Sequence, residues 1–364
     1  MSLQECTTVS FTHEHSELNS ATSTSAAGIS SGSKNYYVFE SLVVIIGIVG
    51  SLANGLVLYV MCTTRQLKKS SINILFVNQM SLDLFSCVWL VISYSVKLAD
   101  IYLVGTTGYW LCVFVIDENI VYCGLIGSSV NLASIAIERY LKIVHPIWHK
   151  NHFRQWMTWL AVVIPWIYGI VANHPVTQAT TIVAHGQCLW GAVWISDTAK
   201  ALYGIWFFVS YFVVVFLSFL YCYGRIIHAV RKQTKVIEVQ QASHPQTSAG
   251  NIQNLRIQIN TIKTMIIVSI LFVVSWLPSN VYILLFQLNL NITFRNDVYY
   301  SSLFLAFLNV CMNPFIYATK YDLVRKQLVV LRLRLLRVNT VEDSGITIDV
   351  PVQSTSHQAI GTEA

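Results

Sequence analysis

The chain has 364 residues, of which 54% are hydrophobic and only 11% are charged. Soluble domains carry about 25% charged residues, so this composition indicates a membrane protein and argues against a pair of soluble domains. The net charge of +6 does not indicate a nucleic-acid partner, because the placement of the basic residues along the chain explains it.

The N-terminal region, residues 1–37, is polar and rich in Ser and Thr. It has no apolar core of the kind that a cleavable signal peptide requires. We therefore expect a disordered segment outside the membrane, followed by a first span that acts as the insertion signal.

Seven stretches are long and apolar enough to cross a bilayer, which requires about 20 mainly apolar residues each. They are Phe39–Cys62, Ile72–Val96, Leu111–Val144, Trp156–Val176, Ala201–Ile227, Ile262–Phe286 and Val298–Tyr317. Their apolar content is continuous, unlike the alternating pattern of a membrane β-barrel. The sequence therefore predicts an all-α membrane protein, a seven-transmembrane helix bundle that occupies residues 38–318.

The basic residues predict the orientation of this bundle. Of the 23 Lys and Arg residues, all but Lys34, Lys97, Lys200 and Arg295 follow spans one, three, five or seven, or flank them. By the positive-inside rule the N-terminus lies outside the cell and the C-terminus is cytoplasmic, as in a multi-pass protein of the plasma membrane. We expect the loop from about Val236 to Leu255 and the tail, residues 338–364, to be polar and mobile.

Three of the eight cysteines fall on the predicted outer side: Cys6 in the N-terminal region, Cys112 at the outer end of span three, and Cys188 in the loop after span four. A disulfide between Cys112 and Cys188 is therefore expected in that oxidising environment. The sequence "NIT" at Asn291 is a glycosylation acceptor in the last outer loop.

Asp83 lies in the middle of the second span, where a carboxylate is costly unless it is protonated or paired. Oxygen-bearing side chains of other spans can reach it, namely Asn54, Ser128, Asn309 and Asn313. Two interpretations stay open: a site for a small hard cation, or a protonated Asp in a structural hydrogen-bond network.

Two further features interrupt the apolar spans. Pro278 and Pro314 each remove a helix hydrogen bond, which predicts either static kinks or helices with two packings of similar energy. Arg139, between Glu138 and Tyr140, lies near the cytoplasmic end of span three. It is either an interfacial arginine whose side chain snorkels to the membrane surface or a residue with a functional role.

These features occur in an order that resembles rhodopsin-like (class A) G-protein-coupled receptors, over about residues 38–337. The motifs are "GSLANGLVL" with Asn54, "SLDL" with Asp83, "ERY" at 138–140, Trp166, "SWLP" at 275–278 and "NPFIY" at 313–317. The resemblance implies a receptor that binds an extracellular ligand and activates heterotrimeric G proteins.

The resemblance also implies roles for individual residues. Glu138 would restrain Arg139 in the resting receptor, and Arg139 would be released to receive the G protein, with Tyr140, Tyr223 and Tyr317 rearranging around it. Phe272, Trp276, Pro278, Asn313 and Pro314 would transmit ligand binding. Asp83, Ser128, Asn309 and Asn313 would form an allosteric sodium site, and arrestin would be a further partner.

Three departures from the family pattern affect these expectations. Val215 replaces the usual proline of helix five, so the bulge there is expected to be missing. Cys112 precedes Arg139 by 27 residues, two more than usual, so span three must start differently. Gln258 stands where some members carry an acid that locks the arginine.

Residues 319–337 interleave Leu and Val with Arg and Lys, which is typical of an amphipathic helix on an anionic lipid surface. They resemble the short eighth helix of the family. No cysteine follows them to carry a lipid anchor.

The ligand class is argued from charge and position. Val121 takes the place where receptors for small amines carry an aspartate, and Val298–Tyr317 has no lysine that could bind retinal. Acidic and aromatic residues in the outer segments favour a neuropeptide-like ligand. Its expected contacts are Asp117, Glu118, Val121, Trp276 and Asn280.

Other classes of protein remain as alternatives. A class A receptor for an amine or a lipid is the first alternative, and a seven-span transporter is less favoured because no pair of broken helices repeats. No enzyme motif or metal-binding spacing is present, so we expect neither catalysis nor a cofactor apart from sodium.

Overall fold

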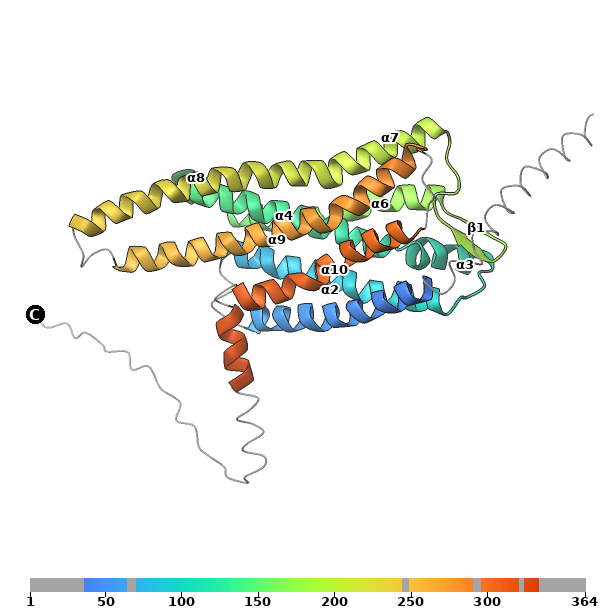
Figure 1. The fold of residues 1–364 in the computed structure, drawn as a ribbon, viewed down its shortest axis with the longest axis horizontal. Coiled ribbons are helices and arrows are strands. Elements are labelled where there is room, and N and C mark those ends of the chain that lie inside the picture. The colour runs from blue at the N-terminus through green and yellow to red at the C-terminus, as the bar shows by residue number, and fades with distance from the viewer. Residues whose placement is uncertain (1–35, 64–69, 244–248, 291–295, 321–323, 334–364) are drawn as a thin grey trace, which may run out of the picture.

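The computed structural model describes residues 36–63, 70–243, 249–290, 296–320 and 324–333, and side chains are described outside 235–257. Within these residues it contains seven helices that are long and apolar enough to cross a membrane. All seven predicted spans are confirmed, and they lie side by side as one bundle (Figure 1). Asn291 and residues 338–364, for which the sequence made predictions, lie outside the described residues.

The helices extend beyond the predicted apolar stretches. The first runs from Tyr36 to Thr63, and the others include α2 (Ser71–Leu98), α6 (Gln155–Thr180), α9 (Ala249–Gln287) and α10 (Asp297–Lys320). The short helix α5 (Pro146–His152) follows the third span. Polar first and last turns belong to these helices because a helix continues past the bilayer wherever its residues favour helix.

The prediction of a mobile loop between spans five and six was wrong over most of its length. Helix α8 (Val214–Ser243) continues to Ser243, and α9 already begins at Ala249. The segment between Val236 and Ser243 consists largely of residues with fair helix propensity, so polarity there does not prevent a helix.

The third span is interrupted near its start. It consists of α3 (Gly105–Leu111), the π-helical turn η2 (Cys112–Ile116) and α4 (Asn119–Val144). Glu118, between the last two, has the left-handed φ of 57°, which is uncommon for a residue with a side chain. A π-turn and a break of this kind add residues without adding length, which accounts for the two extra residues between Cys112 and Arg139.

The fifth span does contain a bulge, so the expectation from Val215 was wrong. The π-helical turn η3 (Phe208–Val213) lies between α7 (Asp197–Phe207) and α8. Ser196 caps the start of α7 by accepting a hydrogen bond of 3.1 Å from the Ala199 amide. A π-turn therefore forms immediately before Val215 without a proline to remove a backbone donor.

A small hairpin adds two strands that the all-α expectation did not include. Strands β1 (Ile182–Ala184) and β2 (Gln187–Leu189) are antiparallel, with Val183 opposite Cys188. Cys188 forms a disulfide with Cys112, as predicted, with the two Cα atoms 5.4 Å apart. The hairpin is thereby fixed to the start of the third span, at what we call the Cys112 end of the bundle.

At the opposite end, the Arg139 end, residues 324–333 form a helix that turns away from α10 (Figure 1). Val324 and Leu328 pack against the core, whereas Val329, Val330 and Leu333 are exposed beside basic residues. Exposed apolar side chains next to Arg and Lys suit a lipid surface. The remainder of the predicted eighth helix, 321–323 and 334–337, lies outside the described residues.

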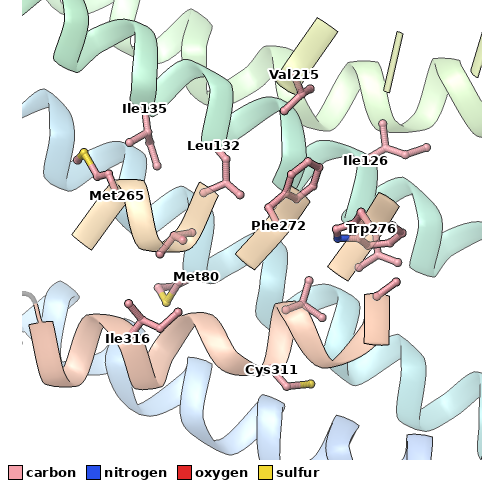
Figure 2. Close-up of a cluster of buried hydrophobic side chains, with 14 of the residues drawn as sticks. Met80, Ile126, Leu132, Ile135, Val215, Met265, Phe272, Trp276, Cys311 and Ile316 are labelled. Carbon is pink, nitrogen blue, oxygen red and sulfur yellow. The ribbon is translucent and has the colours of Figure 1, made fainter. Parts of the chain in front are cut away.

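The core runs along the middle of the bundle (Figure 2). Met80 of α2, Leu132 and Ile135 of α4, and Met265 of α9 are buried there. Other apolar side chains face outwards, among them Leu52, Val171, Leu220 and Leu277. Large apolar side chains on the outer surface of long helices are expected of a bundle surrounded by lipid, so burial and hydropathy agree on a membrane protein.

Candidate functional site

The arginine near the end of the third span is buried and paired with its neighbour. The Nε atom of Arg139 donates a hydrogen bond of 2.6 Å to Oε2 of Glu138, and both side chains are less than one-tenth exposed. Among the described residues, Nη2 of Arg139 has no hydrogen-bond partner. A snorkelling arginine would instead place its guanidinium in water, so the simple interfacial reading does not fit.

His149 of α5 lies next to this pair, with Nε2 3.7 Å from Oε1 of Glu138. Burial lowers the pKa of His149 below its ordinary value, although the Glu138 charge opposes this shift. The imidazole is therefore neutral at pH 7, and Arg139 is the cation that balances Glu138. Gln258 of α9 is exposed.

The three tyrosines predicted to rearrange around Arg139 have other partners in this structure. The Tyr140 hydroxyl lies 3.2 Å from that of Tyr221, and the Tyr223 hydroxyl accepts a hydrogen bond of 3.2 Å from Ser269. The Tyr317 ring packs edge-on against Phe76, with 5.0 Å between centroids. These contacts connect neighbouring helices at the Arg139 end.

Aromatic side chains fill the centre of the bundle above this end. Trp276 contacts Phe272, at 6.3 Å between ring centroids, and Tyr211, at 5.5 Å. Phe272 in turn meets Phe219 edge-on at 5.9 Å. All of these rings are buried, so a displacement of Trp276 must move rings on α8 and η3.

The predicted prolines lie inside helices, Pro278 in α9 and Pro314 in α10. One turn after Trp276, the Asn280 side chain donates a hydrogen bond of 2.9 Å to the Trp276 carbonyl. This predicted ligand contact is therefore bonded to its own helix. Two further prolines that the sequence analysis did not single out, Pro165 and Pro175, lie inside α6.

Asp83 is the centre of a buried polar cluster. Its carboxylate accepts hydrogen bonds from Ser128 Oγ at 2.6 Å and from Asn313 Nδ2 at 2.9 Å. The structure therefore brings together three of the four predicted sodium-site residues. The fourth, Asn309, is buried but its Nδ2 has no partner among the described residues.

Gln79, which was not predicted, also belongs to this cluster. Its Nε2 donates to both carboxylate oxygens of Asp83, at 3.1 and 3.2 Å, and lies 2.5 Å from Ser128 Oγ. The signal was present, because residues four apart share a helix face and Gln79 is a second polar residue within the span.

Two motif residues join the helices around the cluster. Asn54 of the first helix donates to the carbonyl of Val310 in α10, at 3.2 Å. The indole Nε1 of Trp166 in α6 donates a hydrogen bond of 3.0 Å to Oδ1 of Asn78 in α2. Both bonds cross between helices, which accounts for polar residues at these positions in apolar spans.

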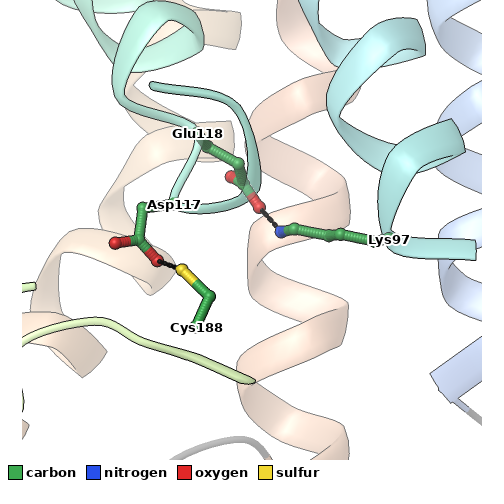
Figure 3. A network of polar contacts seen from close by, with 4 residues as sticks. All are labelled: Lys97, Asp117, Glu118 and Cys188. Atoms are coloured by element: carbon green, nitrogen blue, oxygen red, sulfur yellow. Dashed lines mark hydrogen bonds and ion pairs between the residues drawn. The ribbon is translucent and has the colours of Figure 1, made fainter. Parts of the chain in front are cut away.

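At the Cys112 end the two predicted acids have different surroundings (Figure 3). Asp117 accepts a hydrogen bond of 2.6 Å from Thr181, and its carboxylate lies 3.1 Å from the Cys188 sulfur. Because both nearby sulfurs belong to the disulfide, they offer no thiolate to a metal. Asp117 thus holds the loop after α6 rather than pointing to an open site.

Glu118 forms an ion pair with Lys97 of α2 (Figure 3). The sequence analysis had placed Lys97 among the few outer basic residues and gave it no partner. Glu118 is 6% exposed, and Val121, one turn further, is fully buried. This pair, in the bundle interior near the Cys112 end, is the main electrostatic feature of that end.

Loss of the disulfide is expected to reduce the yield of folded receptor. The bridge closes a separation of 76 residues, and removing a native disulfide typically costs about 2–5 kcal/mol. Cys112→Ser should therefore lower surface expression, measured with an antibody against an N-terminal tag, while Cys62→Ser, at an exposed free cysteine, should not. Equal expression of both variants would contradict this expectation.

Comparison with known proteins agrees with the fold and motifs. The family described as "7 transmembrane receptor (rhodopsin family)" matches residues 53–317. Melanopsin of Mus musculus is 27% identical over 67% of this chain and 46% of its own length, and Melanopsin-A of Danio rerio is 25% identical over 67% and 41%. The chain thus spans about half the length of these relatives.

Two further similarities extend the comparison. The fMet-Leu-Phe receptor of Oryctolagus cuniculus is 27% identical over 69% of this chain and 72% of its own length. The crystal structure of squid rhodopsin superposes with a TM-score of 0.68 over 87% of this chain and 93% of that chain, at 17% identity, which supports the fold alone. With seven spans, the motif residues in place and the family match over most of the chain, the protein belongs to the rhodopsin family of seven-transmembrane receptors, the class A G-protein-coupled receptors.

Proposed function

We propose that this receptor binds a basic, peptide-like ligand from outside the cell at its Cys112 end and activates heterotrimeric G proteins at its Arg139 end. The observation that carries the proposal is the buried Glu138–Arg139 pair at one end of the bundle. Buried aromatic rings around Trp276 occupy the centre, and the Glu118–Lys97 pair lies near the other end. An agonist would shift the population of two packings by its differential affinity for them.

Charge and aromatic content support a basic peptide. Asp100 and Asp197 at the Cys112 end are exposed acids, and the aromatic residues Tyr109, Trp110 and Trp194 are exposed or half-buried there. Such a surface attracts cations by charge and by cation–π contacts. One relative is a receptor named for the peptide fMet-Leu-Phe. The lysine of α10 is its last residue, Lys320, at the Arg139 end, so this helix offers no lysine to bind retinal inside the bundle.

Signalling in cells tests the proposal. The receptor is expressed with dissociation sensors for several G proteins and is challenged with fractionated peptide extract, and in parallel with amines and lipids. A response to a peptide fraction supports the ligand class. A response confined to amines or lipids would retain the receptor and overturn the peptide.

We also propose that Asp83 and its neighbours hold a sodium ion. Oxygen ligands suit this hard cation, and Asp83, Ser128 and Asn313 supply them; the Asn313 Oδ1 atom is buried without a hydrogen-bond partner among the described residues. The ion would add a positive charge beside the buried carboxylate and stabilise the packing around it.

Asp83→Asn is expected to abolish the effect of sodium on agonist binding. Radioligand displacement from low salt up to physiological NaCl, roughly 0.15 M, measures it, with choline chloride holding the ionic strength constant. Ser81→Ala, which removes a hydroxyl bonded to its own helix, should leave the effect intact. A sodium effect that persists in Asp83→Asn would exclude this site.

A further inference from the structure

The first helix carries a buried acid, Glu40, whose side chain forms no ion pair among the described residues. Glu40 is fully buried, and neither of its carboxylate oxygens has a hydrogen-bond partner of normal geometry among the described residues. The Tyr36 hydroxyl, one turn earlier, is a polar neighbour of this carboxylate. A buried carboxylate without a partner is costly, so its retention calls for an explanation.

The charges that act on Glu40 come from two other helices. They are Lys97 of α2 and Glu118 at the start of α4, together with Asp100 just after α2. Lys97 is already engaged, because its ammonium is paired with Glu118 and lies 4.3 Å from the centre of the Tyr94 ring. Both acids are buried, whereas the Lys97 side chain is half-buried and, among the described residues, is paired with Glu118 only.

Aromatic rings from three helices line this cluster. Phe39 meets Tyr94 of α2 at 5.7 Å and Tyr300 of α10 at 4.9 Å between centroids. Tyr300 also contacts Tyr36 at 5.8 Å and Tyr299 at 5.5 Å. Lys97 over Tyr94 shows that one of these faces already holds an ammonium in the free receptor.

We propose that the Glu40–Lys97–Glu118 cluster is the subsite for the cationic group of the ligand, an ammonium or a guanidinium. Lys97 supplies one of the two positive charges that the acids require, and the ligand supplies the other by pairing with Glu40. This inference rests on the proposed function and assigns the residues that would recognise a basic ligand. It also gives Lys97 a role as a resident cation that holds Glu118 before the ligand arrives.

An organic cation fits this cluster better than a metal ion. Calcium takes about 6–8 oxygen ligands, and magnesium needs near-octahedral oxygen coordination. The cluster instead offers separate carboxylates and ring faces, and ring faces attract ammonium and guanidinium groups at about 0.5–2 kcal/mol each.

Thermal unfolding of the purified full-length receptor tests the subsite with n-butylammonium chloride as the probe, against an equal concentration of sodium chloride. We expect the midpoint to rise by about 2 °C or more at saturating probe, since a ligand that binds only the folded state stabilises it. Lys97→Ala, which leaves a cavity for the probe and two unbalanced acids, should show a larger rise. Glu40→Gln should show none.

Each outcome decides the proposal. An equal rise in the wild type and in Glu40→Gln, or no rise in the wild type and in Lys97→Ala, would overturn it. If Glu40→Gln does not fold, Glu118→Gln is measured instead. In that variant Lys97 has lost its Glu118 partner and can pair with Glu40, so the rise in midpoint seen in the wild type should disappear. If Lys97→Ala does not fold, its surface yield in cells grown with and without the amine is measured, and an unchanged yield counts against the subsite.

The thermal readout keeps this inference separate from the proposed function. A receptor that responds to a peptide in cells but shows no Glu40-dependent stabilisation would retain the function and lose this subsite. A receptor stabilised by the probe but activated only by a neutral lipid would retain a cation-binding cluster and lose the peptide assignment.

Discussion

Arg139→Ala is expected to reduce G-protein activation by roughly 10–100-fold without preventing surface expression. Hydrogen bonds to charged groups contribute about 1.5–3 kcal/mol, and about 1.4 kcal/mol corresponds to a factor of ten. The variant removes the guanidinium that would meet the G protein, while the apolar residues around it remain. Agonist-stimulated nucleotide exchange in membranes, normalised to receptor number, measures the loss.

A matched change in the partner should act in the opposite direction. Glu138→Gln removes the charge that holds Arg139 at 2.6 Å and leaves the side-chain shape. The resting packing then loses part of its stabilisation, so basal exchange should rise several-fold. If Arg139→Ala signalled normally, or if both variants behaved alike, the pair would be a structural contact and not a switch.

The sequence was sufficient for the features that depend on apolar length and on motif order. The seven spans and the Cys112–Cys188 bridge are confirmed, and of the residues expected near Asp83 the structure brings Ser128 and Asn313 to its carboxylate. Each depends on local composition or on a residue type that is costly in a membrane unless it has a partner. The contacts of Asn54 and Trp166 follow the same logic.

The features that could not be predicted depend on how helices meet. The π-turns Cys112–Ile116 and Phe208–Val213 are backbone adjustments within apolar runs, and no Gly or Pro marks either one. Val215 pointed to a regular fifth helix because proline is one cause of a bulge but not the only one. The π-turn in the third span sets where Asp117 and Glu118 fall, so the different surroundings of these acids were also out of reach.

Glu40 and Lys97 show a second limit of the sequence. A charge near the end of a span is usually solvated, and nothing local distinguishes these two from such a charge. Only the packing of the first helix and α2 against the third span shows that Glu40 is buried without an ion pair among the described residues and that Lys97 is paired with Glu118.

Gly169→Ala is expected to destabilise the receptor, because α4 and α6 approach each other closely at this position. A Cβ atom at Gly169 of α6 would lie 2.1 Å from the carbonyl oxygen of Cys123 in α4. The obstacle is backbone, which no rotamer change relieves, so α4 and α6 must separate. Overpacking of this kind typically costs about 1–3 kcal/mol, and small residues are what allow helices in a membrane to approach closely.

Gly224→Ala in α8 is the matched control, because a Cβ atom there meets nothing within 4 Å. Alanine in a helix is favoured over glycine by about 0.5–1 kcal/mol, so this variant should be as stable as the wild type or more so. Thermal unfolding followed by size-exclusion fluorescence compares the two. A similar midpoint for both variants would mean that α4 and α6 separate at little cost, and that the close approach at Gly169 does not hold the third span, with its Glu138–Arg139 pair, in place.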